Sequence, residues 1–258
     1  MTNNNAIGLF DSGIGGTSIW REIRQLLPSE DTIYLADSKN APYGLKSQDE
    51  IIALSIKNTE LLLSHNCKLI VVACNTATTN AIQELRHRYD VPFVGIEPAI
   101  KPAAHSSKTQ NVGILATKGT LSSALFSTAL QSYGNTKFIE QIGHGLVELI
   151  ESGKLESPEM TALLHQYLEP MVAAGIDHLV LGCSHYPYLI PQIRKLLPAH
   201  IEIIDSGEAV AKQTQRLLLE KVGMHESGNG HSAFFTNIDP SVLNDILGRK
   251  YLVQQRNF

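Results

Sequence analysis

Two cysteines stand in closely similar surroundings, and such a pair of thiols is suited to moving protons on two sides of one substrate. Cys74 follows the apolar run Val-Val-Ala and precedes Asn-Thr, while Cys183 follows Leu-Val-Leu-Gly and precedes Ser-His. Each falls where a predicted strand gives way to a helix, and the N–H groups and dipole at the start of a helix stabilise a thiolate. The third cysteine, Cys67, lacks this setting and is predicted to be an inert buried side chain.

Polar residues beside the two cysteines and after other predicted strands complete the candidate site. Asp11 ends the first predicted strand and opens the turn Asp-Ser-Gly-Ile-Gly-Gly, whose N–H groups can bind an anion. This turn matches neither the dinucleotide motif nor the phosphate loop. Glu151 lies at the end of a predicted helix. The remaining candidates, which are polar side chains and one Pro-Tyr-Gly turn, are Ser12, Pro42, Tyr43, Gly44, Asn75, Thr76, Thr117, Thr120, Ser184 and His185.

A structural explanation stays open for each of these candidates at the level of sequence. Asp11 can order its own turn, and Thr117 and Thr120 can cap a helix. His185 can be a loop histidine with its hydrogen bonds satisfied, and the Pro-Tyr-Gly stretch can be a plain turn. Glu151, taken alone, is explained more simply as a solvated charge.

The composition is that of an ordinary globular protein, and it excludes several classes of function. With 258 residues, 43% of them hydrophobic, and a net charge of −4, the chain offers no basic surface for nucleic acid. It has no apolar run of the ~20 residues that cross a bilayer and no secretory signal, so a cytoplasmic location without a membrane partner is expected. Three cysteines without a Cys-x-x-Cys pair predict no disulfide framework. The ten histidines show no metal-ligand spacing, so no metal is expected.

The first part of the chain alternates short apolar strands with amphipathic helices, which is typical of a parallel sheet. The expected strands are Ile7–Phe10, Thr32–Leu35, Leu69–Ala73 and Phe93–Ile96. The expected helices are Thr17–Leu27, Gln48–Ser64 and Thr76–Tyr89.

The second part repeats this plan at a nearly constant offset. Its expected strands are Val112–Leu115, His178–Leu181 and Ile201–Ile204, and its expected helices are Ser122–Tyr133, Ser157–Ala174, Pro187–Leu197 and Gly207–Val222. Gly8 aligns with Gly113 at an offset of 105 (113 − 8), and Cys74 aligns with Cys183 at an offset of 109 (183 − 74). The tail from about Glu226 is polar and weakly helical from Pro240 to Leu247, and no chemistry is expected there.

Together these features predict an α/β fold of two similar lobes. Each lobe is expected to contain a mostly parallel sheet flanked by helices. Because ligands bind at the carboxyl ends of strands in such sheets, the loops that carry the candidate residues are expected to converge on an active site in the cleft between the lobes.

Four of these motifs, in this order, resemble the bacterial glutamate racemases of the aspartate/glutamate racemase family. They are Phe-Asp-Ser-Gly-Ile-Gly-Gly from Phe10, Ala-Asp from Ala36 with the following Pro-Tyr-Gly, Ala-Cys-Asn-Thr-Ala from Ala73, and Gly-Cys-Ser-His-Tyr-Pro from Gly182. The resemblance runs from about Ile7 to Leu219. It implies an enzyme that interconverts L- and D-glutamate without a cofactor and supplies D-glutamate for peptidoglycan.

The resemblance also implies roles for individual residues. Cys74 is the acid/base that takes the α-proton from D-glutamate, and Cys183 takes it from L-glutamate. Asp11 and His185, with Glu151, match residues that assist the thiols. Asp11, His185 and the nine remaining candidates fall at or near substrate-binding positions. It implies one lobe formed by residues 1–97 and 206–258 and a second formed by 98–205. Glutamate is then the partner, and a homodimer stays open.

Two differences from the family affect these expectations. Ser184 stands where the family usually has threonine, which keeps the hydroxyl but removes a methyl group and is expected to loosen the pocket. The chain also lacks the long N-terminal extension that some members use for activation by a cell-wall precursor, so no such activation is expected.

Three alternatives accompany the glutamate racemase hypothesis. The nearest is a racemase for aspartate or a related compound such as a hydantoin. A thiol redox protein is disfavoured because the cysteines are far apart in sequence and lack Cys-x-x-Cys. A non-catalytic two-lobed amino-acid-binding protein is the third, and binding without turnover would identify it.

Overall fold

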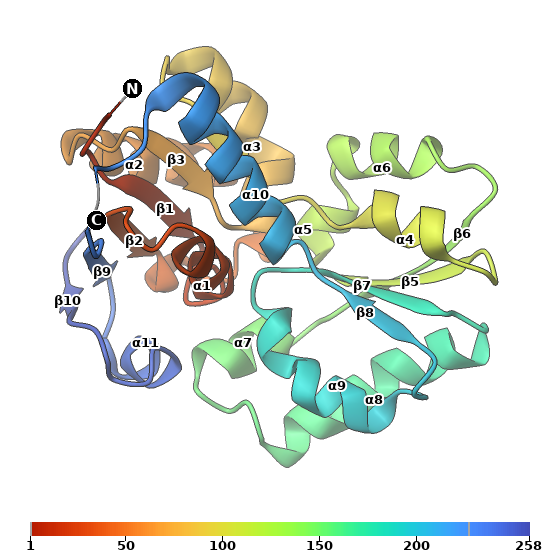
Figure 1. Ribbon diagram of the computed structural model, residues 1–258. Coiled ribbons are helices and arrows are strands. Elements are labelled where there is room, and N and C mark those ends of the chain that lie inside the picture. The colour runs from red at the N-terminus through yellow and green to blue at the C-terminus, as the bar shows by residue number, and fades with distance from the viewer. Residues whose placement is uncertain (1, 227) are drawn as a thin grey trace.

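The computed structural model describes residues 2–226 and 228–258 and contains two α/β lobes that lie side by side (Figure 1). Met1 of the N-terminal segment and Ser227 of the predicted polar tail lie outside the described residues. Each lobe has one parallel sheet with helices packed on it, which confirms the predicted fold class. Both chain ends belong to the first lobe (Figure 1).

The first lobe is built on a six-stranded parallel sheet in the order β10-β9-β2-β1-β3-β4. Its strands are β1 (Ile7–Asp11), β2 (Thr32–Ala36), β3 (Leu69–Val72), β4 (Phe93–Gly95), β9 (Ser232–Thr236) and β10 (Val253–Gln255). Its main helices are α1 (Thr17–Leu26), α2 (Gln48–Ser64), α3 (Asn75–Arg88), α10 (Gly207–Leu217) and α11 (Ser241–Ile246). Strands β1 and β3 are buried along their whole length, as their continuous apolar sequences require when helices cover both faces of a sheet.

The second lobe is built on a four-stranded parallel sheet in the order β6-β5-β7-β8. Its strands are β5 (Asn111–Ala116), β6 (Lys137–Ile142), β7 (His178–Gly182) and β8 (Glu202–Ile204). Its helices are α4 (Ile100–Ser106), α5 (Lys118–Leu121), α6 (Ala124–Gln131), α7 (Leu146–Glu151), α8 (Pro158–Ala173) and α9 (Ile190–Leu196).

The strand order explains the offset between the two halves of the sequence. The order β2-β1-β3-β4 in the first sheet has its counterpart in β6-β5-β7-β8 in the second. Strand β1 therefore corresponds to β5, and β3 corresponds to β7. Cys74 lies two residues beyond the end of β3, and Cys183 lies one residue beyond the end of β7. The two thiols thus occupy corresponding places at the carboxyl ends of two sheets, where ligands bind in this kind of fold.

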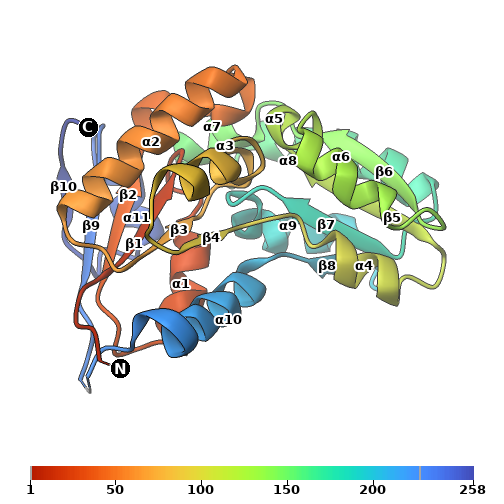
Figure 2. The same cartoon turned by 90° about the horizontal axis from the view of Figure 1, so that it is seen from above.

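Two short segments connect the lobes, and the lobes also pack on each other directly. The chain leaves the first sheet after β4 and returns after β8. The Ser206 hydroxyl on the returning segment donates to the carbonyl of Glu97 on the outgoing one, so the two connections are tied together. A single buried apolar cluster includes Ile14 of the first lobe and Leu146 and Ile150 of the second. Figure 2 shows α1 and α10 side by side on one face of the first lobe.

Three expectations about the elements were wrong in detail. The polar tail supplies strands β9 and β10 to the first sheet, with β9 pairing along β2. Strand β6 at the edge of the second sheet was missed. The helix expected at Ser122–Tyr133 is present as α6, but a separate short helix that was not predicted, α5, comes before it, because Thr117 and Ser123 each accept a hydrogen bond from the backbone and start a separate helix.

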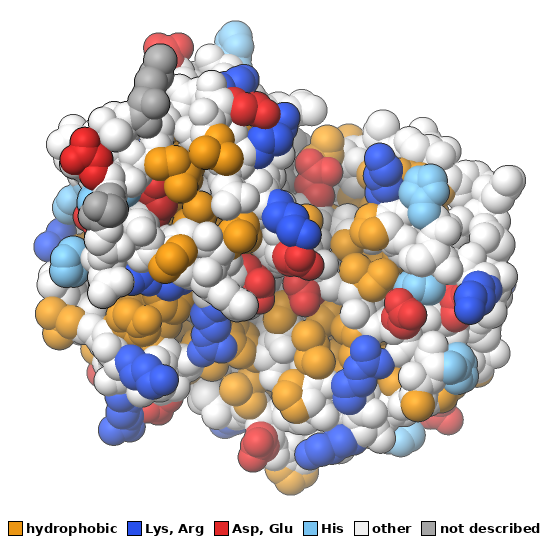
Figure 3. Space-filling view, viewed as in Figure 1, with side chains coloured by type: hydrophobic (Ala, Val, Ile, Leu, Met, Phe, Trp, Pro, Cys, Tyr) orange, Lys and Arg blue, Asp and Glu red, His pale blue; other side chains and the backbone are white. Residues whose placement is uncertain are grey.

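On the face seen in Figure 3, acidic and basic side chains are scattered over both lobes and do not gather into one basic patch. Among residues 2–226 and 228–258, every helix is too short or too polar to traverse a bilayer.

Candidate active site

The two thiols line one small cavity between the lobes. Cys74 is the residue that caps α3, and its sulfur accepts a hydrogen bond from the Ala77 N–H at 3.5 Å. Cys183 enters the same cavity from the second lobe. The cavity has a volume of only about 10 Å3, about the space of one water molecule. An amino acid can therefore enter only if the lobes move apart.

Cys74 is held in an environment that favours the neutral thiol. The residue is buried, with 3% of its surface exposed. Its sulfur lies 3.7 Å from the hydroxyl oxygen of Ser12. Burial raises the pKa of Cys74 well above its usual value, and the nearby carboxylate of Asp11 raises it further. The hydrogen bonds from Ala77 and Ser12 act in the opposite direction but are weaker than these effects.

Cys183 has a histidine as its neighbour. Its sulfur lies 3.8 Å from Nδ1 of His185, and the hydroxyl of Ser184 lies 3.3 Å from the same nitrogen. Burial alone lowers the pKa of His185, but hydrogen bonds to Cys183 and Glu151 and the charge of Asp11 outweigh burial and place this pKa well above 6.5. The raised pKa favours a cationic imidazole beside the sulfur of Cys183.

The position of Glu151 fixes the orientation of this imidazole. Nε2 of His185 lies 2.6 Å from Oε1 of Glu151 and 3.3 Å from the backbone nitrogen of Gly15. The shorter contact to a carboxylate requires that Nε2 carry a proton, because an acceptor-only group needs a donor. The ring then donates to Glu151, and Nδ1 is left to face Cys183.

Glu151 also joins the two lobes. It belongs to the second lobe, yet its Oε1 accepts from the backbone N–H of Ile14 at 2.7 Å and its Oε2 accepts from the hydroxyl of Ser38 at 2.8 Å, both in the first lobe. These bonds form only when the lobes are closed. Closure of the lobes therefore supplies two hydrogen-bond donors, from Ile14 and Ser38, to Glu151, the carboxylate that orients His185.

Asp11 is a buried carboxylate that organises the opening turn and contacts the second lobe. Its Oδ2 accepts from the backbone N–H groups of Gly13 at 3.2 Å and Gly16 at 3.0 Å, and its Oδ1 accepts from the hydroxyl of Ser184 at 3.1 Å. Burial raises the pKa of Asp11, while the charge of His185, 4.0 Å away, lowers it in part. Asp11 thus acts on Cys74 through its charge and contacts Ser184 and His185, the two neighbours of Cys183.

Asn75 supplies an amide group that has no partner among the described residues. It is 2% exposed, and neither its Nδ2 nor its Oδ1 makes a hydrogen bond. A buried polar group without a partner costs about 1–3 kcal/mol, so it is retained where a ligand satisfies it. Asn75 lies at the first position of α3, where the backbone N–H groups favour an anion such as a carboxylate.

A cluster of threonine hydroxyls crosses the cleft beside Asn75. The Oγ1 of Thr76 in the first lobe lies 2.8 Å from that of Thr117 and 3.4 Å from that of Thr120, both in the second lobe. Gly44 packs against the same place, since a Cβ on it would lie 2.8 Å from Cβ of Thr117. A residue larger than glycine at position 44 would therefore displace the lobes.

The structure brings the predicted site residues together in two layers. The cavity is lined by both cysteines and by nine of the other predicted residues: Ser12, Pro42, Tyr43, Gly44, Asn75, Thr76, Thr117, Ser184 and His185. Asp11, Glu151 and Thr120 lie behind that lining and contact it. Thr117 both lines the cavity and caps α5, so its two explanations hold together. Sequence reasoning missed Val147, which lines the cavity from α7, and Ser38, whose only signal was its place in the loop after β2.

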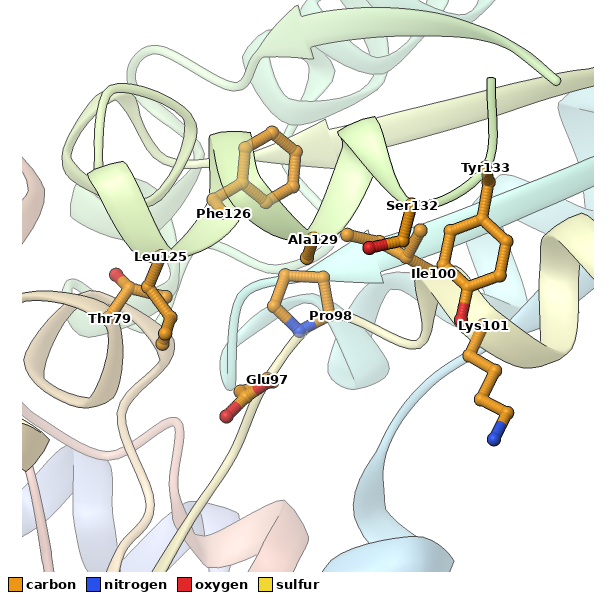
Figure 4. Close-up of a pocket in the computed structure, with 10 residues that line it drawn as sticks. All are labelled: Thr79, Glu97, Pro98, Ile100, Lys101, Leu125, Phe126, Ala129, Ser132 and Tyr133. Atoms are coloured by element: carbon orange, nitrogen blue, oxygen red, sulfur yellow. The ribbon is translucent and has the colours of Figure 1, made fainter. Parts of the chain in front are cut away.

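A larger cavity lies away from the thiols, beside the segment that crosses to the second lobe (Figure 4). It has a volume of about 320 Å3, and its walls include Thr79 of α3, Glu97 and Pro98 of the crossing segment, and Phe126 and Tyr133 of the second lobe. Because both lobes contribute to these walls, the shape of the cavity changes when the lobes move. Neither Cys74 nor Cys183 lines this cavity, so it is not the candidate active site.

The cysteines and histidines do not form other centres in the described part of the chain. Cys67, Cys74 and Cys183 are all free thiols. Burial raises the pKa of Cys67 to about 12, as expected for an inert side chain. Within residues 2–226 and 228–258, His, Cys, Asp and Glu form no group of three or more that could hold a metal ion.

Comparisons with known proteins agree with this site. The model of the Asp/Glu/Hydantoin racemase family matches residues 7–214. A glutamate racemase of Ectopseudomonas mendocina (strain ymp) is 50% identical over 222 residues, which cover 85% of this chain and 83% of the relative.

Solved structures show the same likeness over the whole chain. A glutamate racemase, isoform RacE1 from Bacillus anthracis, superimposes with a TM-score of 0.88 at 30% identity and covers 98% of this chain and 97% of its own. An Escherichia coli glutamate racemase, solved in complex with L-glutamate and the activator UDP-MurNAc-ala, superimposes with a TM-score of 0.87 at 31% identity and covers 98% of both chains. The chain therefore belongs to the glutamate racemases of the Asp/Glu/Hydantoin racemase family and is an isomerase that acts as an amino-acid racemase.

Proposed function

We propose that this chain interconverts L- and D-glutamate without a cofactor, with Cys74 and Cys183 as its two acid/base groups. The observation that carries the proposal is that the two thiols, from corresponding strand ends of two lobes, line the same closed cavity. Inversion at the α-carbon requires a proton to leave one face and another to arrive at the opposite face. Two fixed groups achieve this without rotation of the substrate.

The different surroundings of the thiols support a resting state in which they differ by one proton. The raised pKa of Cys74, which results first from burial, keeps it a neutral thiol. The imidazolium of His185 stabilises a thiolate on Cys183. Like groups held in unlike protonation states are what a two-base mechanism requires.

From this state L-glutamate reacts first. The thiolate of Cys183 takes the α-proton, and the electron pair of the broken C–H bond stays on the substrate as a carbanion. The thiol of Cys74 then gives its proton to the opposite face, and D-glutamate forms. The protein is left with a thiol at Cys183 and a thiolate at Cys74, which is the form that takes the α-proton from D-glutamate in reverse.

The carbanion needs stabilisation because an α-proton is far less acidic than a thiol. The unpaired amide of Asn75 and the N–H groups at the start of α3 are suited to the substrate carboxylate, where negative charge accumulates. Hydroxyls of Ser12 and Thr76 also line the cavity. Closure to a cavity of about 10 Å3 excludes water and strengthens each of these interactions.

Glutamate is the substrate that the comparisons favour, since a relative at 50% identity is named a glutamate racemase. The test is circular dichroism of purified protein with L-glutamate and, separately, with D-glutamate, with no cofactor added. The proposal predicts that both signals decay to zero, since the equilibrium mixture is racemic. Turnover of aspartate and not glutamate, or dependence on added pyridoxal phosphate, would refute it.

We further propose that the D-glutamate supplies peptidoglycan synthesis and that the reaction takes place in the cytoplasm. The likeness to the glutamate racemases supports the first point, and the free state of all three cysteines is in keeping with the second. The test is complementation of a bacterium that requires D-glutamate for growth. Growth without D-glutamate is expected from the parent gene and not from a gene encoding Cys74→Ala.

A further inference from the structure

We propose that Asp37 and Asn237 form a positioning pair that holds the Pro42–Gly44 wall of the thiol cavity, so that the C-terminal β9–β10 segment is part of the active site. The inference rests on the proposed function, because it assigns a role to a wall of that site. Neither residue lines the cavity. Both act on it through Tyr43.

Asn237 connects the C-terminal segment to the loop that follows β2. It comes directly after β9 and is 5% exposed. Its Oδ1 accepts from the backbone N–H of Lys39 at 2.8 Å, and its Nδ2 donates to Oδ1 of Asp37. The same Nδ2 lies 3.3 Å from the backbone carbonyl of Phe258. One amide thus joins three segments of the chain.

Asp37 is the centre of the network. It follows β2, it is 1% exposed, and donors from several elements point at its carboxylate. Oδ1 accepts from Asn40 at 2.7 Å as well as from Asn237, and Oδ2 accepts from the phenol of Tyr43 and, at 3.5 Å, from Asn58. The donors to this buried carboxylate are asparagine amides and a phenol, and none of these donors is a cation. The carboxylate therefore acts by fixing the orientation of these groups through hydrogen bonds.

Tyr43 transmits this arrangement to the cavity. Its hydroxyl donates to Asp37 and accepts from Nδ2 of Asn58 at 3.1 Å, so both roles of the hydroxyl are filled and the ring is fixed. The pKa of Tyr43 is raised well above 10, first by burial and then by the charge of Asp37, which keeps the phenol a donor. The fixed ring lines the cavity beside Gly44.

The wall meets the second lobe with almost no spare room. A Cβ on Gly44 would lie 2.8 Å from Cβ of Thr117, and a Cβ on Gly119 would lie 3.1 Å from Cα of Gly44. A displacement of the wall by about 1 Å is therefore enough to obstruct closure or to open a gap, and errors of this size are costly in active sites. Loss of the pair is expected to weaken substrate binding more than the chemical step.

The experiment compares Asn237→Ala with a matched control, Asn257→Ala, which changes an exposed asparagine of the same segment. Asn237→Ala removes the three hydrogen bonds of this amide, two of which hold the loop after β2, so we expect KM for glutamate to rise about tenfold while kcat falls less than about threefold. A purely structural role would reduce the fraction of active protein, which lowers apparent kcat and leaves KM unchanged. The control should retain both constants.

Two further variants test the route through Tyr43. In a Tyr43→Phe background, Asn237→Ala should raise KM by less than about twofold, because residues that act in one network are not additive. The exchanged pair, Asp37→Asn with Asn237→Asp, restores one donor and one acceptor, with the direction of the hydrogen bond reversed. Its KM should therefore lie close to that of the parent and below the raised KM of either single variant. The proposal would be overturned if the effects of Tyr43→Phe and Asn237→Ala on KM were fully additive and the exchanged pair kept the raised KM of the single variants.

Hydrogen exchange separates this inference from the proposed function. Asn237→Ala should speed exchange of the backbone amides of residues 38–46 and leave those of α8 unchanged, whether or not the protein racemises glutamate. If the parent protein fails to racemise, the proposed function is wrong, and the exchange pattern alone decides the positioning role. Unchanged exchange in residues 38–46 with unchanged KM would refute the inference.

Discussion

Glu151→Gln should uncouple lobe closure from the charge on His185. The glutamine has almost the same shape, so its amide oxygen can replace Oε1 opposite His185 and Ile14, and its NH2 group can donate to Ser38, whose hydroxyl turns to accept. All three contacts keep their geometry. What is removed is the negative charge 2.6 Å from the imidazole.

The magnitude follows from the kind of hydrogen bond that is changed. A bond to a charged group contributes about 1.5–3 kcal/mol and a neutral one about 1 kcal/mol, so the variant loses about 1 kcal/mol of preference for the imidazolium. Glu151 is only 12% exposed, so solvent screens this interaction little. A loss of this size is about fivefold in the protonation equilibrium. The pKa of His185 is therefore expected to fall.

The effect on stability has a definite sign with pH. The folded-state pKa of His185 is raised, so protonation of His185 stabilises the fold fully below its unfolded value of about 6.5, and this contribution is lost as pH rises through the folded-state pKa. The parent should therefore exceed the variant in free energy of unfolding by about 1 kcal/mol at pH 6, which lies below the unfolded-state pKa of histidine. The difference should disappear at a pH above the folded-state pKa of the parent.

Two measurements check this prediction. Nitrogen-15 chemical shifts of the imidazole report the pKa of His185 directly, and urea unfolding at a series of pH values reports the stability difference. Glu156→Gln, at an exposed acid in the turn between α7 and α8, is the control and should change neither. A His185 pKa that is the same in Glu151→Gln and in the parent would refute the role assigned to this carboxylate.

Two other predictions concern the thiols and the cleft. Cys74→Ala and Cys183→Ala should each reduce racemisation by at least about a thousandfold, as expected when an acid/base group is lost, and full activity in either variant would exclude the two-base mechanism. Gly44→Ala places a Cβ 2.8 Å from Cβ of Thr117, so steady-state kinetics should show KM for glutamate raised about tenfold, whereas Gly134→Ala, where nothing lies within 4 Å, should leave KM unchanged. An unchanged KM for Gly44→Ala would show that the lobes do not close as tightly as the structure indicates.

The sequence predicts those parts of the fold whose signals are local. Buried parallel strands are continuous apolar runs, and both cysteines directly follow such runs. The constant offset predicted two similar lobes, and the matching strand order confirms this. The glycine-rich turn after β1 and the Pro-Tyr-Gly turn also carry local signals, which is why so many cavity-lining residues could be named in advance.

Other features depend on contacts between distant residues, and no local pattern reveals them. Strand β6 lies at a sheet edge and contains only half-buried and exposed residues, with Lys137 and Glu140 exposed, so it has no buried apolar run. Strand β9 is short and is stabilised by pairing with β2, about 200 residues earlier. Asn237 reaches Asp37 over the same separation. Local strand propensity could not indicate either contact, because both depend on residues about 200 positions apart in the sequence.

The two thiols have different surroundings, so we expect that they are not interchangeable. Cys74 lies near a carboxylate and a hydroxyl, while Cys183 lies near an imidazole that closure holds in place through Glu151. In the proposed mechanism, this difference determines which thiol starts with the proton. Since the equilibrium constant of racemisation is one, it cannot change the ratio of kcat/KM for the two isomers, and its effects appear in the separate values of kcat and KM.

Transfer of the α-proton in heavy water tests the central claim most directly. Purified protein is incubated with ordinary L-glutamate in heavy water, without cofactor, and the first few per cent of reaction are analysed by mass spectrometry after separation of the isomers. Two bases on opposite faces predict D-glutamate that carries deuterium at the α-carbon, beside L-glutamate that still carries protium. A single base that returns its own proton would give D-glutamate with protium, and that result would contradict the account.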